Sequence, residues 1–182
     1  VIPVKDFCEM SVELANTRVE LNSKFSRALN LSNLKIGQYW LKMLPEQRLP
    51  LPTMHFPIRS SSDGKMTRPY IASTVDTVEI SSTGISLPKI VTFQISDGLK
   101  RKVLIKGSND DLRQDAIMEQ VFGQVNKILQ KDKQMRKLDL NISTYEVIPL
   151  GPNAGIIEYV AHSVSLNQIL VVLHRNDPVS FD

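Results

Sequence analysis

Five prolines, at positions 45, 50, 52, 57 and 69, divide this 182-residue chain into two parts of different character. Proline lacks a backbone N–H and its ring clashes with the preceding turn of a helix, so this stretch favours extended chain. Hydrophobic residues before it recur at helical spacing, and those after it alternate as in strands. We therefore predict a helical region, a boundary in the proline-rich stretch, and then a sheet domain.

The region before the prolines carries hydrophobic residues on one face of a helix. The set that recurs every seven residues is Phe7, Leu14, Leu21 and Ala28. A second apolar run consists of Ile36, Trp40, Leu41 and Leu44, and Pro45 is predicted to stop it. This spacing predicts helices over residues 4–44 that pack against a neighbouring element.

The region after the prolines contains five short runs whose apolar residues alternate or cluster as in strands. They cover residues 75–80, 90–95, 100–106, 143–148 and 155–160. Asp97 and Gly98 form a hairpin-turn signal between the second and third runs. The first three runs therefore predict an antiparallel meander.

One long helix is predicted between the third and fourth strands, over residues 110–130. Asp110 or Asp111 can cap its N-terminus, where a carboxylate also suits the helix dipole. Its predicted buried stripe consists of Ile117, Val121, Val125, Ile128 and Leu129. A last helix is predicted to begin after a cap at Ser165. The pattern predicts an α+β fold: a five-stranded antiparallel sheet with one long covering helix, preceded by helical segments.

The composition excludes several classes of protein. With 42% hydrophobic and 23% charged residues the chain is globular rather than disordered. Its net charge of +3 suits a phosphate ligand, but no basic stripe with interleaved aromatics indicates nucleic acid.

The single cysteine excludes an internal disulfide, which fits a reducing compartment, and no metal site is predicted from the three histidines. No apolar run is long enough to span a membrane. Because the chain begins at Val1, we interpret it as a fragment or a processed product.

The residues that indicate a phosphate-binding site lie at 106–115, KGSNDDLRQD. Lys106 ends a predicted strand and shares a face with Leu104, so its ammonium can reach a polyphosphate while Leu104 supports a base. A carboxylate at the start of the following helix can hold the ammonium in place, as a helix acid does in protein kinases. On the residues alone, an ordinary surface salt bridge at a helix start remains an equal alternative.

These ten residues closely resemble the signature of the phosphatidylinositol 3-kinase superfamily. Residues 145–160, YEVIPLGPNAGIIEYV, resemble the strand–turn–hinge segment of the same kinases, and residues 115–129 resemble a helix of their N-terminal lobe. The resemblance covers residues 75–181. It is strongest to the protein-kinase branch of the superfamily, in particular to fungal kinases of the ataxia-telangiectasia-mutated type.

The resemblance implies two groups of ATP-binding residues. On the phosphate side, Lys106 contacts the α and β phosphates, and Asp110 and Asp115 orient the lysine. Because Asn109 makes this loop longer than in some relatives, Asp111 can take the place of Asp110. The implied phosphate loop consists of Ser86, Leu87, Pro88 and Lys89. On the adenine side, the implied pocket consists of Leu104, Tyr145 and Ile157, with hinge backbone atoms of Glu158 and Val160 and a stacking ring from Tyr159.

The resemblance also implies a domain plan. Residues 1–45 form the end of a helical FAT-like region, 46–160 the kinase N-lobe, and 161–182 the hinge exit with the first C-lobe helix. The implied cofactor is ATP with Mg²⁺, whose ligands lie outside the chain. The HRND sequence at 174–177 comes too early for a catalytic loop, so we interpret it as a helix end and a turn. No catalytic residue is predicted, and the isolated chain is expected to be inactive.

The kinase implied by this resemblance is a nuclear serine/threonine kinase of DNA-damage and telomere signalling. Its implied partners are protein substrates, the remaining C-lobe, FAT and FATC regions, a second copy in a homodimer and, indirectly, a DNA-end-sensing complex, with no membrane. Two alternatives remain open: a phosphatidylinositol kinase N-lobe, and a non-catalytic interaction module of a large assembly.

Overall fold

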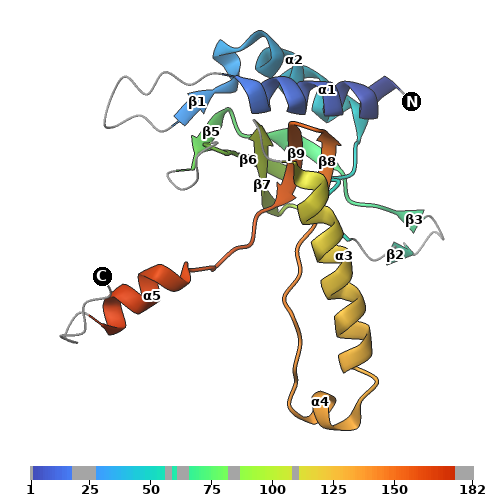
Figure 1. Cartoon of the computed structure of the whole chain (residues 1–182). Helices are drawn as coiled ribbons and strands as arrows, with labels where there is room; N and C mark the ends of the chain where they lie inside the picture. Colours follow the sequence, from blue (N-terminus) through green and yellow to red (C-terminus); the bar gives the residue numbers. More distant parts are fainter. Residues whose placement is uncertain are drawn as a thin grey trace.

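The computed structural model describes residues 2–17, 28–55, 59–60, 66–81, 87–107 and 111–174. Two helices, α1 (Ile2–Asn16) and α2 (Lys35–Gln47), lie across one side of an antiparallel sheet, and α3 (Leu112–Leu129) projects away from it (Figure 1). The short helix α4 (Lys133–Lys137) follows α3, and α5 (Leu166–Leu173) stands apart at the C-terminal end. The α+β class is confirmed.

The main sheet has the strand order β1-β5-β6-β7-β9-β8, with β4 also paired to β6. Its strands are β1 (Ala28–Asn30), β4 (Ile71–Thr74), β5 (Thr77–Ile80), β6 (Lys89–Ile95), β7 (Lys100–Gly107), β8 (Val147–Gly151) and β9 (Ala154–Glu158). A separate small ribbon pairs β2 (Arg59–Ser60) with β3 (Met66–Thr67). The central strands β6, β7 and β9 lie close to the predicted runs, whereas β1 and β4 were not predicted.

Strand β1 corrects the prediction of helix through residue 44. Leu29 pairs with Val78 of β5, and Leu31 N donates to the Asp76 carbonyl at 2.8 Å. The Asp76 carboxylate also accepts from Ser32 N at 2.6 Å and from Ser32 Oγ at 2.9 Å. These bonds to a distant segment hold the chain extended, although its apolar spacing alone favours helix.

The fourth predicted strand began too early. The structure places β8 at Val147–Gly151, and residues 143–146 form no part of a strand. The amide of Asn126 in α3 binds the backbone N–H and carbonyl of Ile142, both at 2.8 Å. This segment therefore runs beside α3 and joins the sheet only at Val147.

The two faces of the sheet differ in burial, and this difference positions the functional site. Val91, Phe93 and Ile95 of β6 are buried, whereas the residues between them are only partly buried. Because neighbouring side chains in a strand point to opposite faces, the buried set faces α1 and α2. The other face, which carries Leu104 and Lys106 of β7, is open.

The core beneath the helices is built around three aromatic rings. The Phe7 and Trp40 rings stack with centroids 5.4 Å apart, and the Trp40 and Phe93 rings meet edge to face at 5.7 Å. These residues come from α1, α2 and β6 respectively. The helical region before the prolines and the sheet after them therefore share one hydrophobic core.

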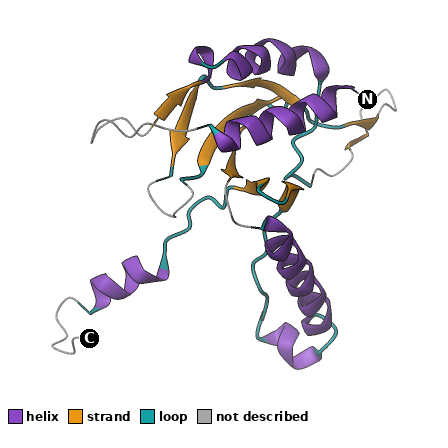
Figure 2. Cartoon of the chain, turned by 45° about the horizontal axis from the view of Figure 1, so that its top comes forward, coloured by secondary structure: helices purple, strands orange, loops and turns teal. Residues whose placement is uncertain are grey.

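Helix α3 does not cover the sheet, which corrects the prediction of a buried stripe. Ile117 is 58% exposed and Ile128 is 65% exposed, and Leu112 is the buried residue of this helix. Only the first turn contacts the sheet, and the rest of the helix projects from it (Figure 2). The covering helices are α1 and α2.

The helix caps are partly as predicted. Asp111 caps α3, since its carboxylate accepts from Arg113 N at 3.1 Å, and Ser165 caps α5 by accepting from Gln168 N at 3.3 Å. Helix α2 ends at Gln47 rather than at the predicted Pro45. Among the described residues, no helix has both the length and the apolarity needed to cross a membrane.

Alanine substitutions at two helical glycines are predicted to have opposite effects on stability. A Cβ on Gly37 would lie 2.0 Å from the Leu31 carbonyl oxygen, whereas a Cβ on Gly123 meets nothing within 4 Å. We expect Gly37→Ala to destabilise the chain by about 3 kcal/mol, because backbone must move, and Gly123→Ala to stabilise it by up to about 1 kcal/mol. Urea unfolding followed by Trp40 fluorescence measures both; similar midpoints for the two variants would contradict the packing at Gly37.

Candidate functional site

A cavity of about 460 Å³ lies on the open face of the sheet, within the size range of small-molecule sites. Its lining residues come from the ends of β5, β6, β7 and β9, from α3 and from the segments beside β8 and β9. They are Ser81, Ile90, Leu104, Lys106, Asp115, Tyr145, Ile157, Glu158, Tyr159, Val160 and Ser163. The cavity thus joins an apolar floor to one cationic and two acidic side chains.

Eight of the predicted site residues line this one cavity. They are Leu104, Lys106, Asp115, Tyr145, Ile157, Glu158, Tyr159 and Val160. Strand pairing explains the floor, because Leu104 of β7 lies opposite both Ile90 of β6 and Ile157 of β9. These three side chains come from neighbouring strands and line one continuous apolar surface.

Gly155 allows α3 to begin close to the cavity. It pairs with Lys106 across the β7–β9 ladder, and a Cβ at this position would lie 2.6 Å from a methyl of Leu112. Leu112 is the buried first residue of α3. The missing side chain therefore brings the start of α3, and with it Asp115, beside the end of the strand that carries Lys106.

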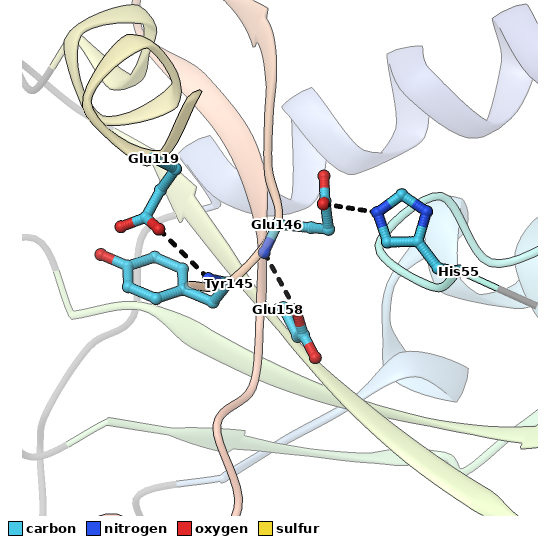
Figure 3. Close-up of polar contacts among 5 residues, drawn as sticks. All are labelled: His55, Glu119, Tyr145, Glu146 and Glu158. Carbon is cyan, nitrogen blue, oxygen red and sulfur yellow. Dashed lines mark hydrogen bonds and ion pairs between the residues drawn. The ribbon is translucent and has the colours of Figure 1, made fainter. Parts of the chain in front are cut away.

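Four polar contacts hold the segment that contains Tyr145, and Figure 3 draws those that involve a side chain. Tyr145 N donates to the Glu119 carboxylate at 3.2 Å, and Glu146 N donates to Glu158 Oε2 at 3.0 Å. Glu158 N donates to the Glu146 carbonyl at 2.8 Å, and His55 Nε2 lies 2.6 Å from Glu146 Oε1. The Glu158 N–H is therefore already used within the protein, and it cannot be the donor to a bound base.

The electrostatics around Tyr145 show how close the charged groups are. Burial raises the pKa of the Tyr145 phenol, Glu119 and Asp115 raise it further, and Lys106 acts in the opposite direction. The phenol is therefore neutral at physiological pH. Lysine and two carboxylates thus surround a neutral ring at the inner end of the cavity.

Tyr159 stands at the outer end of the cavity. Its side chain is 36% exposed, and Lys102 Nζ lies 5.5 Å from its ring centroid. The same ammonium forms an ion pair with Glu79 Oε1 at 2.7 Å. A cation over the ring limits the movement of the ring. The remaining surface of the ring therefore stays in one orientation, in which it can stack on a flat ligand.

The phosphate side is only partly assembled from the predicted residues. Ser86 and Asp110 lie outside the described residues, and Leu87 and Pro88 are half-buried. Lys89 corrects the prediction, because its side chain points to the opposite face from Ile90 and is 5% exposed. Its Nζ donates to the Ala15 carbonyl at 2.5 Å.

Asp111, a predicted cap of α3, has a second role that the sequence did not predict. Its carboxylate binds the Arg113 guanidinium through two hydrogen bonds, at 2.8 and 2.7 Å. These hydrogen bonds hold the pKa of the Asp111 carboxyl below its usual value. Asp111 therefore serves as helix cap and partner of Arg113.

Some lining residues were missed from the sequence. Ile90 could have been found, because it lies opposite Leu104 once the hairpin at Asp97 and Gly98 is accepted. Glu119 does not line the cavity but binds Tyr145 N beside it, and it was also missed; it follows Asp115 by four residues, so the two share a face of the helix. No comparable signal pointed to Ser81 or Ser163. Within the described ranges, no three side chains of His, Cys, Asp or Glu are grouped to hold a metal ion.

Comparison with known proteins identifies relatives over the whole chain. The family model described as phosphatidylinositol 3- and 4-kinase matches residues 102–181. The serine/threonine-protein kinase TEL1 of Saccharomyces cerevisiae is 65% identical over 181 residues, covering 100% of this chain and 6% of the relative. TEL1 of Kluyveromyces lactis is 58% identical, covering 99% of this chain and 6% of the relative.

Solved structures agree with the fold. The FAT and kinase domain of CtTel1 superimposes with a TM-score of 0.81 at 34% identity, covering 96% of this chain and 12% of that chain. The complete CtTel1 dimer with C2 symmetry gives 0.82 at 33% identity, covering 100% and 7%. The present chain thus spans about 6% of the length of the curated relatives.

Proposed function

Because this chain belongs to the phosphatidylinositol 3- and 4-kinase family, we propose that it is the ATP-binding part of a serine/threonine protein kinase of Tel1 type. One observation carries the proposal: a single cavity joins Lys106 and Asp115 to the apolar floor of Leu104 and Ile157. A cation and a base-sized apolar surface in one cavity match the two ends of a nucleotide.

Each side of the cavity has a distinct task in this proposal. The adenine lies between the apolar floor and the Tyr159 ring. Backbone atoms of the hinge residues Glu158 and Val160 form hydrogen bonds with the edge of the base. Since the Glu158 N–H is used by Glu146, the donor to adenine is the Val160 N–H. Lys106, oriented by Asp115, binds the phosphates. When bound, Mg²⁺ neutralises phosphate charge, and we propose that its ligands and the catalytic aspartate belong to other parts of the parent kinase.

The proposed substrate is a protein hydroxyl group, supported by the similarity to the TEL1 relatives, which are serine/threonine-protein kinases. The test uses the natural polypeptide that contains this segment, with γ-labelled ATP and equal amounts of a serine peptide and phosphatidylinositol vesicles. We expect label in the peptide and none in an alanine-substituted copy of it. Label in the lipid alone would overturn the protein-kinase assignment in favour of a lipid kinase.

The wider setting is also part of the proposal. Exposed apolar residues on α3 and α5, such as Ile128, Leu166 and Leu173, support contact with further kinase segments, namely the C-lobe and the FAT and FATC regions. The similar structure of a Tel1 dimer supports a homodimer. A nuclear role in DNA-damage and telomere signalling, downstream of a DNA-end sensor, follows from kinship alone.

Tyr159 supplies a test of the adenine side. Removing the ring by Tyr159→Ala is expected to weaken binding of a non-hydrolysable ATP analogue about 5- to 10-fold, because stacking contributes about 1 kcal/mol or more. Tyr159→Phe keeps the stacking surface and is expected to bind within about twofold of wild type. Tyr39→Ala, an exposed tyrosine on α2, is the matched control. Equal affinities for Tyr159→Ala and Tyr39→Ala would remove Tyr159 from the site.

A further inference from the structure

Lys89 places a buried ammonium group on the covered side of the sheet, behind the nucleotide cavity. It begins β6 directly after Leu87 and Pro88, and only 5% of it is exposed. Burial lowers the pKa of the Lys89 ammonium, because a charge loses its hydration there. A buried charge needs a compensating partner, and this one donates to the Ala15 carbonyl at the end of α1 at 2.5 Å.

Lys89 satisfies one of the backbone carbonyls at the end of α1. Thr17 N donates to the Leu14 carbonyl at 3.2 Å, and Thr17 Oγ1 donates to the Glu13 carbonyl at 3.0 Å. The carbonyl of Ala15 receives its bond from Lys89, 74 residues away in sequence. No basic residue lies in the last turn of α1 itself, so Lys89 also supplies the cation that suits the negative end of a helix dipole.

The same carbonyl touches the strand that carries Lys106. A Cβ on Gly107 would lie 2.6 Å from the Ala15 oxygen and 2.8 Å from the Ala15 carbonyl carbon. Lys89 is also paired across the ladder with Ile105, the residue before Lys106. The end of α1 therefore lies against the last residue of β7 and binds the first residue of β6.

We propose that Lys89 is a positioning residue, which anchors both strands beside the nucleotide phosphates to the C-terminal end of α1. The inference rests on the proposed function, since it concerns the same cavity. Ile90 and Lys106 face the cavity, while their neighbours Lys89 and Gly107 face α1. The C-terminal end of α1 lies at the Gly107 and Ala154 ends of β7 and β9, whereas the hinge follows the opposite end of β9, so a shift there is expected to affect the phosphate side more than the hinge.

The test compares a ligand with phosphates and one without, in the natural polypeptide that contains this segment. The probes are the ATP analogue AMP-PNP and adenosine. We expect Lys89→Met to weaken AMP-PNP binding about 5- to 10-fold and to change adenosine binding by less than about twofold. Lys89→Arg keeps the charge and is expected to recover most of the loss. Lys131→Met, an exposed lysine after α3, is expected to match wild type.

Gly107→Ala tests the same contact from the other strand. Its Cβ has no room against the Ala15 carbonyl, so it should cause the same phosphate-specific loss, whereas Gly123→Ala, with open space around its Cβ, should cause none. If Lys89→Met yields no folded protein, Lys89→Arg and Gly107→Ala decide the question. In either case, adenosine binding reports the fraction of molecules in which the cavity is correctly folded.

The outcomes separate this inference from the proposed function. Unchanged AMP-PNP affinity in Lys89→Met and Gly107→Ala, or equal loss of both ligands, would overturn the positioning role. If Lys106→Met weakens AMP-PNP while the Lys89 and Gly107 variants do not, the inference alone fails. If wild type binds neither probe, the proposed function fails and the inference falls with it.

Discussion

Replacing Lys106 by methionine is expected to lower kcat/KM for ATP in the proposed parent kinase by about 100-fold or more. The side chain lies at the end of β7 in the cavity, beside Asp115 and the Tyr145 ring. Methionine has a similar length but no charge, so it fills the space without attracting phosphate. Fixed charges at a transferring phosphoryl group typically contribute two to three orders of magnitude in rate, about 3 to 4 kcal/mol.

The control for this variant lies in the same strand. Lys100 is exposed at the opposite end of β7, six positions before Lys106, so both belong to the same face. Lys100→Met is expected to keep kcat/KM within about twofold of wild type. Steady-state assays at varied ATP measure both variants. A loss of less than about threefold for Lys106→Met would show that this lysine is not the phosphate ligand.

Replacing Phe93 by alanine is expected to destabilise the 182-residue chain by about 3 to 5 kcal/mol. Phe93 has no exposed surface, and its ring lies 5.7 Å from that of Trp40 and 6.2 Å from that of Phe7. Truncation leaves a cavity between the sheet and both covering helices. A loss this large is a substantial share of the free energy of unfolding of an ordinary domain, so we expect a much larger unfolded fraction in the variant than in wild type.

Trp40 is the single tryptophan of the chain, so its fluorescence reports directly on this core. Urea unfolding of wild type, Phe93→Ala and Phe93→Leu is expected to give the lowest midpoint for alanine and an intermediate one for leucine. Leu138→Ala changes an exposed residue and should stay within about 0.5 kcal/mol of wild type. A Phe93→Ala midpoint equal to that of Leu138→Ala would contradict the shared core of helices and sheet.

The parts of the molecule that could be predicted depend on local signals. Strands β6 and β7 follow from alternation and from the turn at Asp97 and Gly98, and their pairing brings Ile90 opposite Leu104. Lys106 and Asp115 lie on either side of one strand–helix junction, so few arrangements keep them apart. A short turn joins β8 to β9, and β9 pairs with β7, which brings the hinge residues implied by the family resemblance to the cavity.

Other features could not be predicted because they depend on distant partners. Residues 28–30 form β1 because Asp76 and Val78 hold them, although their spacing favours helix. The apolar stripe of α3 predicts burial, but an apolar face is buried only where another element meets it. In the described structure α1 and α2 occupy the covered side of the sheet, and α3 contacts it only through its first turn.

The sequence by itself determined the class of fold and the central strands, because alternation, turns and caps are properties of neighbouring residues, and its family resemblance pointed to most residues of the cavity. Only the tertiary structure decided which helices cover the sheet and where Lys89 points. The family resemblance placed Lys89 in the implied phosphate loop. In the folded chain its ammonium lies behind the cavity, because the Ala15 carbonyl at the end of α1 accepts a hydrogen bond from it there and the pleat of β6 directs the side chain to that carbonyl.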